Sequence, residues 1–205
     1  MDFTNRQIEI IAAATKLIGE KGIQNLTTKN LANEMKFSEP ALYRHFKGKT
    51  DILSSVLKYY RDELKEDIFN ILRAETTGIE KIETIFKFQF AHFSRNPGIV
   101  MVIFSETSFQ YDKELSQTVL EIMTQKKELM TNIIEFGQQD GSIRNDVNKN
   151  HLATIIMGSM RLTILRWRLT NFKFNLEEQG QVFFTTLKQL IQNCNVDTEN
   201  QKIHQ

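Results

Sequence analysis

Residues 27–50 read TTKNLANEMKFSEPALYRHFKGKT. Apolar residues at helical spacing predict two short helices, near 28–35 and 38–47, that flank the turn Lys36-Phe37-Ser38. Ala32 is small where the two helices have to approach closely. The segment contains five basic and two acidic residues, so its net charge is +3, while the net charge of the whole chain is only +1. This pattern predicts a helix-turn-helix with a locally positive surface, which is typical of DNA binding.

A recognition helix projects polar side chains into the major groove while its flanks hold phosphates. We expect the second helix of the pair to face the major groove. Thr28 and Lys49, each at the N-terminus of a helix, are expected to bind DNA phosphates. The alternative is that Tyr43 and His45 only pack against or cap the helix, and that the lysines of this segment are ordinary solvated surface residues. The predicted DNA-binding residues are Thr27, Thr28, Lys29, Ser38, Glu39, Pro40, Ala41, Tyr43, Arg44, His45 and Lys49.

Helical periodicity continues through the rest of the chain, and no stretch alternates as a strand does. Nine Gly and two Pro are few for a β-sandwich or barrel. The sequence therefore predicts an all-α fold of about nine helices, with a DNA-binding head at 1–50, a body at 51–194 and a disordered tail at 195–205. The helices outside the pair are expected near 4–21, 49–73, 79–95, 98–108, 115–139, 149–171 and 175–194.

Composition and spacing also exclude several classes of protein. A single cysteine, Cys194, leaves no partner for a disulfide within the chain and suits a reducing compartment. The four histidines are scattered, and no zinc-protease motif, nucleophile elbow or phosphate loop occurs. The apolar runs are too short to span a membrane, and the first residues lack the pattern of a signal peptide. We expect a cytoplasmic protein that is not an enzyme and uses no cofactor or metal.

The stretch from Arg6 to Leu53 resembles the DNA-binding head of the TetR/AcrR family of bacterial regulators. The most specific part is the run from Ala41 to Phe46, ALYRHF, followed by Lys49. The resemblance implies a homodimeric transcription factor, most often a repressor, that a small molecule releases from DNA. It also implies phosphate contacts by the residues that match Thr28, Tyr43 and Lys49.

Two positions depart from the family pattern. Lys36 stands in the turn where the family usually has glycine, so we expect a non-glycine residue with positive φ there, at some cost in strain. Pro40 stands where a small residue is usual, which stiffens the first turn and makes base contact at that position apolar. Neither change removes DNA binding, but both alter which bases are read.

The last two predicted helices favour dimerisation. Apolar residues cover nearly the whole circumference of 149–171, which predicts burial on every side. Phe184 and Ile191 lie off the core stripe of 175–194. We therefore expect a symmetric four-helix interface between two copies, with close approach at Gly158 and Ser159. Two heads on one dimer require a near-palindromic operator.

Aromatic and methionine residues gather in the body and favour a cavity for a hydrophobic effector, although ordinary core packing is the simpler interpretation of any one of them. Arg161 and His92 are possible polar anchors for such a ligand. Arg161 lies in the apolar helix and needs an anionic partner, either a ligand or a carboxylate such as Glu106 or Glu135. The predicted lining is Phe86, Phe90, Phe93, Phe104, Met123, Met157, Met160, Arg161 and Trp167. The alternative function is a DNA-associated adaptor whose body binds a protein and no small molecule.

Overall fold

A computed structural model describes residues 3–105 and 112–193, and within those ranges the fold is all-α, as predicted. Cys194, Glu106 and the tail predicted at 195–205 lie outside the described residues. The helices are α1 (Asn5–Lys21), η1 (Ile23–Asn25), α2 (Thr28–Glu34), α3 (Glu39–Tyr43), α4 (Lys49–Glu63), α5 (Lys65–Arg73), α6 (Gly78–Arg95), α7 (Pro97–Ile103), α9 (Lys113–Gln139), α10 (Lys149–Leu169) and α11 (Leu176–Ile191).

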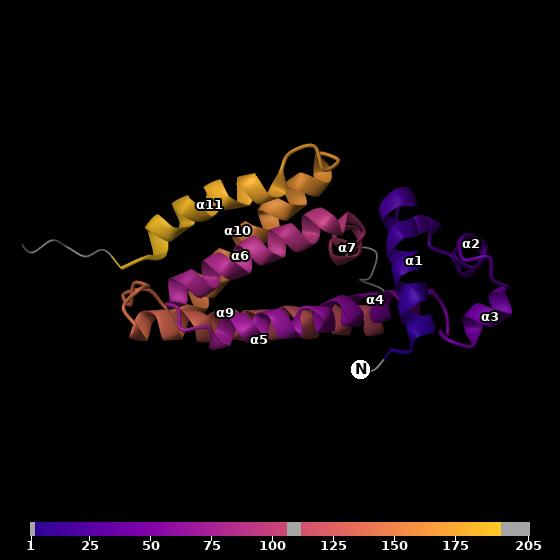
Figure 1. Cartoon of the computed structure of the whole chain (residues 1–205), viewed down its shortest axis with the longest axis horizontal. Helices are drawn as coiled ribbons and strands as arrows, with labels where there is room; N and C mark the ends of the chain where they lie inside the picture. Colours follow the sequence, from indigo (N-terminus) through magenta and orange to yellow (C-terminus); the bar gives the residue numbers. More distant parts are fainter. Residues whose placement is uncertain (1–2, 106–111, 194–205) are drawn as a thin grey trace, which may run out of the picture.

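Local capping explains several of these boundaries. Thr4 and Thr77 each begin a helix with a capping box, in which the threonine side chain and a Gln or Glu three residues on satisfy each other's backbone N–H groups. The helix predicted over 49–73 is divided at Leu64 into α4 and α5. Because Leu64 keeps right-handed helical angles, α5 continues along the line of α4 (Figure 1).

The helices form a head at one end and a longer body (Figure 1). α1, α2 and α3 make the head, and α4 runs from it along the body. The head core also includes Val102 of α7 and Leu115 of α9, so its apolar cluster extends into the body. A second cluster, centred on α6, α9, α10 and α11, fills the body.

A close crossing of α1 and α7 joins head and body beside the α4 connection. Gly19 and Gly98 meet there, and a Cβ on Gly98 would lie 2.4 Å from the backbone oxygen of Thr15. That separation is far inside van der Waals contact, so only glycine fits at this position. The head is therefore attached to the body through α1 and α7 as well as through the continuous helix α4.

Burial in α10 and α11 differs from the prediction. Phe184 and Ile191 are each only 2% exposed and belong to the core of their own subunit, so the prediction that they face a second copy was wrong. Within a single chain α10 is not covered on every side: Ile155, Leu162 and Leu169 are 55%, 66% and 68% exposed. These three residues recur every seven positions and therefore share one face of the helix.

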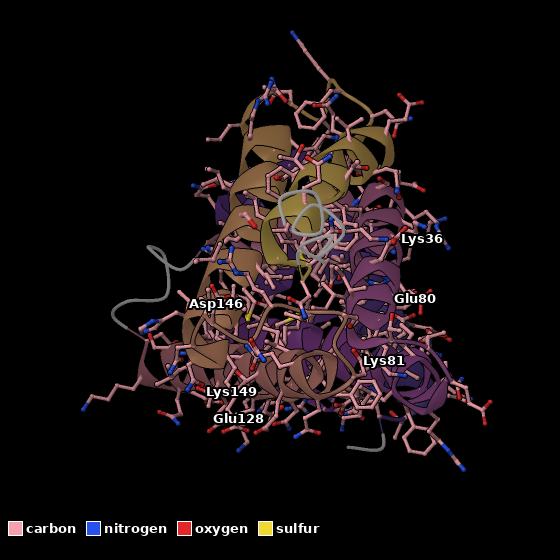
Figure 2. The ribbon with its side chains drawn as sticks, turned by 90° about the vertical axis from the view of Figure 1, so that its left-hand side faces the viewer. Lys36, Glu80, Lys81, Glu128, Asp146 and Lys149 are labelled. Carbon is pink, nitrogen blue, oxygen red and sulfur yellow. The ribbon has the colours of Figure 1, made fainter. Side chains whose placement is uncertain are left out.

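A buried lysine closes the end of α5. Lys81 of α6 is 5% exposed, and its Nζ donates to the carbonyl oxygens of Ile71 and Ala74 and to Thr76 Oγ1. A cation there satisfies carbonyl groups that have no partner within the helix and complements the negative end of its dipole. Figure 2 views the body from the end away from the head, with Lys81 labelled.

Candidate DNA interface and body cavities

The helix-turn-helix is built by α2, a tight turn and α3. The Thr27 hydroxyl begins α2 by accepting from Asn30 N at 3.0 Å. At the other end of α2, Phe37 N donates to Ala32 O at 2.8 Å while Lys36 adopts φ 56°. The left-handed conformation predicted for Lys36 is confirmed. It lets the chain reverse directly into Ser38 at the start of α3.

The N-terminus of α1 holds this turn in place. The Arg6 guanidinium lies 5.1 Å from the centre of the Phe37 ring, within cation–π range. Gln7 Nε2 donates to His45 O at 3.3 Å, just beyond α3. The two contacts connect α1 to both ends of the second helix of the motif. The position of α3 therefore depends on residues 31 and 38 positions earlier in the chain than the ones they contact.

A polar network joins α2 to α3. Thr28 Oγ1 donates to Glu39 Oε2 at 2.9 Å, and Tyr43 Oη donates to Thr28 Oγ1 at 3.4 Å. The Tyr43 ring nevertheless remains 52% exposed. Two of the side chains expected to bind phosphate thus lie side by side, positioned by the carboxylate of Glu39. The network keeps the outer faces of both helices at a fixed spacing before DNA is present.

α3 is shorter than the predicted 38–47, so Arg44 and His45 follow the helix instead of lying within it. Ser38 occupies the N-cap position but makes no side-chain capping bond. Its hydroxyl is solvent-exposed, as are Pro40 and Arg44. Ala41 is half-buried on the same short helix. The exposed side chains at the start of α3 are those that a groove can reach.

Lys49 begins α4 and lies close to the head. Its Nζ donates to Ile23 O at 3.0 Å, and burial lowers the pKa of the ammonium. Lys29 and Thr27 are exposed on the α2 side. Most of the predicted DNA-binding residues therefore lie on or next to α2 and α3, at the outer end of the head (Figure 1), while Lys49 lies at the start of α4. Sequence reasoning did not foresee the bond from Lys49 to η1, which joins residues 26 positions apart.

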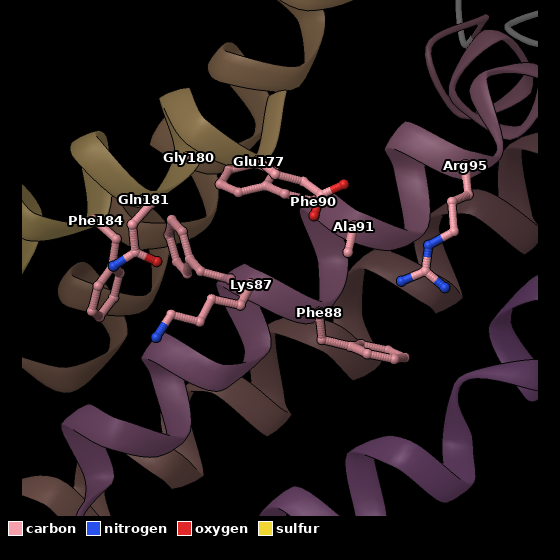
Figure 3. A pocket seen from close by; sticks show the side chains of 10 residues that line it. Lys87, Phe88, Phe90, Ala91, Arg95, Glu177, Gly180, Gln181 and Phe184 are labelled. Atoms are coloured by element: carbon pink, nitrogen blue, oxygen red, sulfur yellow. The ribbon is translucent and has the colours of Figure 1, made fainter. Parts of the chain in front are cut away.

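A groove opens between α6 and α11, with a volume of about 440 Å³ (Figure 3). Its apolar floor contains Phe86, Phe90 and Phe184, whose rings pack edge-on or tilted at centroid distances of 5.1 and 5.6 Å. Phe90 lies so close to α11 that a Cβ on Gly180 would overlap its ring. Lys87, Arg95 and Glu177 line the same groove.

A second, smaller cavity of about 40 Å³ lies among α4, α6, α7 and α9, and Phe93 lines it. Of the predicted lining residues, only Phe86 and Phe90 border the larger groove and only Phe93 borders the smaller cavity. Met123 is 46% exposed on α9 and borders neither space, and Met157 and Met160 are half-buried against the body core. Trp167 is buried and donates from Nε1 to Phe174 O at 2.9 Å.

Arg161 lies over an aromatic ring, with its guanidinium carbon 4.4 Å from the centre of Phe104. Of the two carboxylates predicted as partners, Glu135 is ion-paired with Lys149, and Glu106 lies outside the described residues. In residues 3–105 and 112–193, no cluster of three or more His, Cys, Asp or Glu side chains could hold a metal ion. Within those ranges there is also no helix both long and apolar enough to cross a membrane.

Two family models together cover most of the chain. The model of bacterial regulatory proteins of the tetR family matches residues 10–56, which contain the helix-turn-helix. The model of the C-terminal region of YsiA-like proteins matches residues 58–192. The chain belongs to the tetR family. It is a DNA-binding transcription regulator with an N-terminal helix-turn-helix, and the sequence resemblance is confirmed.

Several relatives share nearly the whole length of this tetR-family chain. A nucleoid occlusion factor, SlmA, from Aliivibrio fischeri strain MJ11 is 23% identical, with 92% of this chain and 96% of SlmA covered. FadR from Bacillus subtilis, solved in complex with stearoyl-CoA, superposes with a TM-score of 0.78 at 22% identity, covering 88% of this chain and 96% of FadR. KstR2, a ketosteroid transcriptional regulator from Mycobacterium tuberculosis, superposes with a TM-score of 0.75 at 17% identity. The match covers 94% of this chain and 97% of KstR2.

In this tetR-family body, His92 was predicted from the sequence as a possible polar anchor, whereas Gln89 and Lys126 were not singled out. Gln89, His92 and Lys126 all line the smaller cavity. Gln89 and His92 are one helical turn apart on α6, a weak signal that becomes visible only against their apolar neighbours. Lys126 sits on α9 between polar residues, and nothing local distinguishes it from the exposed Lys127 beside it.

Proposed function

We propose that this chain is a homodimeric repressor that binds a near-palindromic operator and leaves it when a small hydrophobic molecule binds the body. The observation that carries the proposal is the continuity of the head with the body. α4 and the α1–α7 crossing lead from the helix-turn-helix directly to the smaller cavity, whose walls include α4 and α7. Because its operator is DNA inside a bacterial cell, the protein acts in the cytoplasm. Binding and release of that DNA regulate transcription without a catalytic step.

The exposed face of α10 and α11 supports dimerisation. Ile155, Leu162 and Leu169 line one side of α10, and a Cβ on Gly158, on the same side, would meet nothing within 4 Å. Val182 and Leu190 of α11 are 65% and 63% exposed. A two-fold axis through this face would bury these side chains against their own copies. The four-helix interface stays as predicted, with these residues in place of Phe184 and Ile191.

Effector binding and operator binding would be linked through head spacing. A molecule that widens the space among α4, α6, α7 and α9 displaces the helix that carries the head. If ligand and operator favour different spacings, each weakens the other by the same factor, on the order of 5- to 150-fold. The complex of FadR with stearoyl-CoA and the ketosteroid regulator KstR2 support an apolar or amphipathic effector.

The adaptor alternative has its own supporting observation. Phe69 and Leu72 of α5 and Leu120 of α9 are exposed apolar side chains on helices outside the α10–α11 face. An exposed apolar surface away from a dimer interface is typical of a protein-binding site. The two functions differ in one measurable respect. An adaptor keeps its operator affinity whatever small molecule is added, whereas an effector-controlled repressor does not.

The first experiment selects bound sequences from a random DNA pool and then measures affinity for the selected site as salt is varied. Lys49→Ala should weaken binding to all sequences and lower the salt slope by about one per protomer, because it removes a phosphate contact. Arg44→Ala should instead change which bases are preferred. Lys173→Ala, an exposed lysine in the turn between α10 and α11, is the matched control and should change neither quantity. Absence of DNA affinity above background at low salt would refute the proposal.

A thermal-shift screen of lipophilic compounds tests control by an effector. Each compound that raises the melting temperature is then added to an operator titration. Stabilising compounds should weaken operator binding several-fold or more. Compounds that stabilise the protein but leave operator affinity unchanged would contradict the coupling and favour the adaptor function.

A further inference from the structure

The smaller body cavity has an unusual lining for its size. Its walls are mostly apolar and come from four helices, with Leu57 on α4, Phe93 on α6, Ile99 and Ile103 on α7 and Ile122 on α9. Its volume of about 40 Å³ holds one small polar group and no more. A ligand larger than that group would have to part the helices that form the walls.

Two polar atoms face this cavity without a partner. Gln89 is 8% exposed, and its Nε2 is fully buried and makes no hydrogen bond within the described residues. The same holds for Nε2 of His92, one turn further along α6. Buried polar groups are almost always paired, because an unpaired donor loses its bonds to water and gains nothing in return. Two such nitrogens on residues of one cavity wall are therefore available to bind an acceptor.

A cation lies at the same place. Lys126 of α9 lines the cavity, and burial lowers the pKa of its ammonium. No carboxylate in the described part of the chain forms an ion pair with it. The other cation of the cavity, Arg61, is already paired with Asp62 at 2.8 Å. The Lys126 charge also helps to lower the pKa of His92, after the larger effect of burial, so the two groups are close enough to interact.

We propose that Gln89, His92 and Lys126 form a binding site for the oxyanion of an amphipathic molecule, either a carboxylate or a phosphate monoester. The amide and the imidazole each present an N–H, and Lys126 adds a charge-assisted bond, so all three groups supply what an oxyanion accepts. The apolar wall residues would pack against the adjoining hydrocarbon chain. This inference rests on the proposed function and specifies the chemistry of its effector.

The site also explains how binding of such a ligand in the body would move the head. Entry of the headgroup brings the hydrocarbon chain against Leu57 of α4 and Ile103 of α7. Both helices are attached to the head, α4 by direct continuation and α7 by its crossing with α1. The headgroup fixes the ligand, and the chain displaces the helices.

Isothermal titration of the full-length protein with three matched probes tests the assignment. Decanoate and decyl phosphate carry the two oxyanions, and decan-1-ol is the neutral control. At least one oxyanion probe should bind about ten-fold more tightly than the alcohol, and the stronger of the two identifies the source. Lys126→Met should abolish that preference while leaving the affinity for decan-1-ol unchanged. Lys127→Met, the exposed neighbour, is the matched control and should bind all three probes as wild type does.

Gln89→Leu supplies a second readout that a purely structural role would not produce. It removes an unpaired buried donor and keeps the volume, so the melting temperature of the ligand-free protein should stay the same or rise, while the oxyanion preference falls. A fall in melting temperature with unchanged preference would mean that the amide serves only the fold.

Three results would each overturn the site. Decanoate, decyl phosphate and decan-1-ol could bind with equal affinity, or neither oxyanion probe could bind. Alternatively, Lys126→Met could lower the affinity for all three probes equally. None of these results affects operator binding measured without ligand. The proposed function fails separately, if the wild-type protein does not bind DNA.

Discussion

The head and the body use their buried residues differently. In the head cluster, residues such as Ile10, Leu31 and Leu42 are fully buried within one chain. The polar side chains that join α2 to α3 are bonded to one another. In the body, three buried nitrogens, on Gln89, His92 and Arg168, have no partner within the described residues. The body also leaves large apolar side chains of α10 and α11 exposed.

The difference shows what each part requires. A head whose groups are satisfied within one chain can present its DNA-binding surface preassembled. A body with unpaired donors and exposed apolar side chains is stabilised when a second copy or a ligand binds, because binding pairs the donors or covers the apolar surface. Regulation is therefore expected in the part whose interactions are incomplete on its own.

The largest expected effect separates residues of the body core from residues of its exposed face. Phe184→Glu replaces a ring that packs on Phe86 with a carboxylate and should cost about 3–5 kcal/mol, because the packing of the ring is lost and a charge enters the body core. Leu162→Glu changes a 66% exposed residue and should leave the fold intact while producing monomers. Thermal unfolding and sedimentation measure the two outcomes. A folded, monomeric Phe184→Glu would show that the body core is not as described.

A smaller effect is expected where head and body meet. Gly98→Ala puts a methyl group 2.4 Å from Thr15 O and should lower the free energy of unfolding by about 1–3 kcal/mol. Because the crossing links α7 to the head, Gly98→Ala should also change operator affinity. Wild-type stability in Gly98→Ala would remove the crossing as a route between the two parts.

The smallest effect concerns the one strained backbone position in the helix-turn-helix. Lys36→Gly should raise the free energy of unfolding by up to about 1 kcal/mol, because glycine adopts φ 56° without a Cβ clash. Lys47→Ala removes an exposed charge nearby without a change of backbone and should leave stability almost unchanged. Chemical denaturation resolves the difference. If Lys36→Gly were destabilising, the strain would lie elsewhere in the head.

Much of the fold could be predicted from residues close together in the chain. Threonine caps, apolar periodicity and turn residues located most helices within a few positions, and the position usually held by glycine predicted the left-handed backbone of Lys36. The errors occurred where neighbours in space are distant in sequence. Phe184 and Ile191 lie off their helix's main stripe, but α6 and the body core cover them nonetheless.

The sequence by itself determined the all-α class, the helix-turn-helix and its local positive charge, because helical hydrogen bonds and capping involve residues within about four positions. Only the tertiary structure decided which apolar faces are left uncovered, that Lys49 is bonded to η1, and that Gln89, His92 and Lys126 share a cavity. Those facts depend on helices far apart in sequence packing side by side. The amphipathic pattern of a single helix says which face is apolar, but it does not say what that face meets.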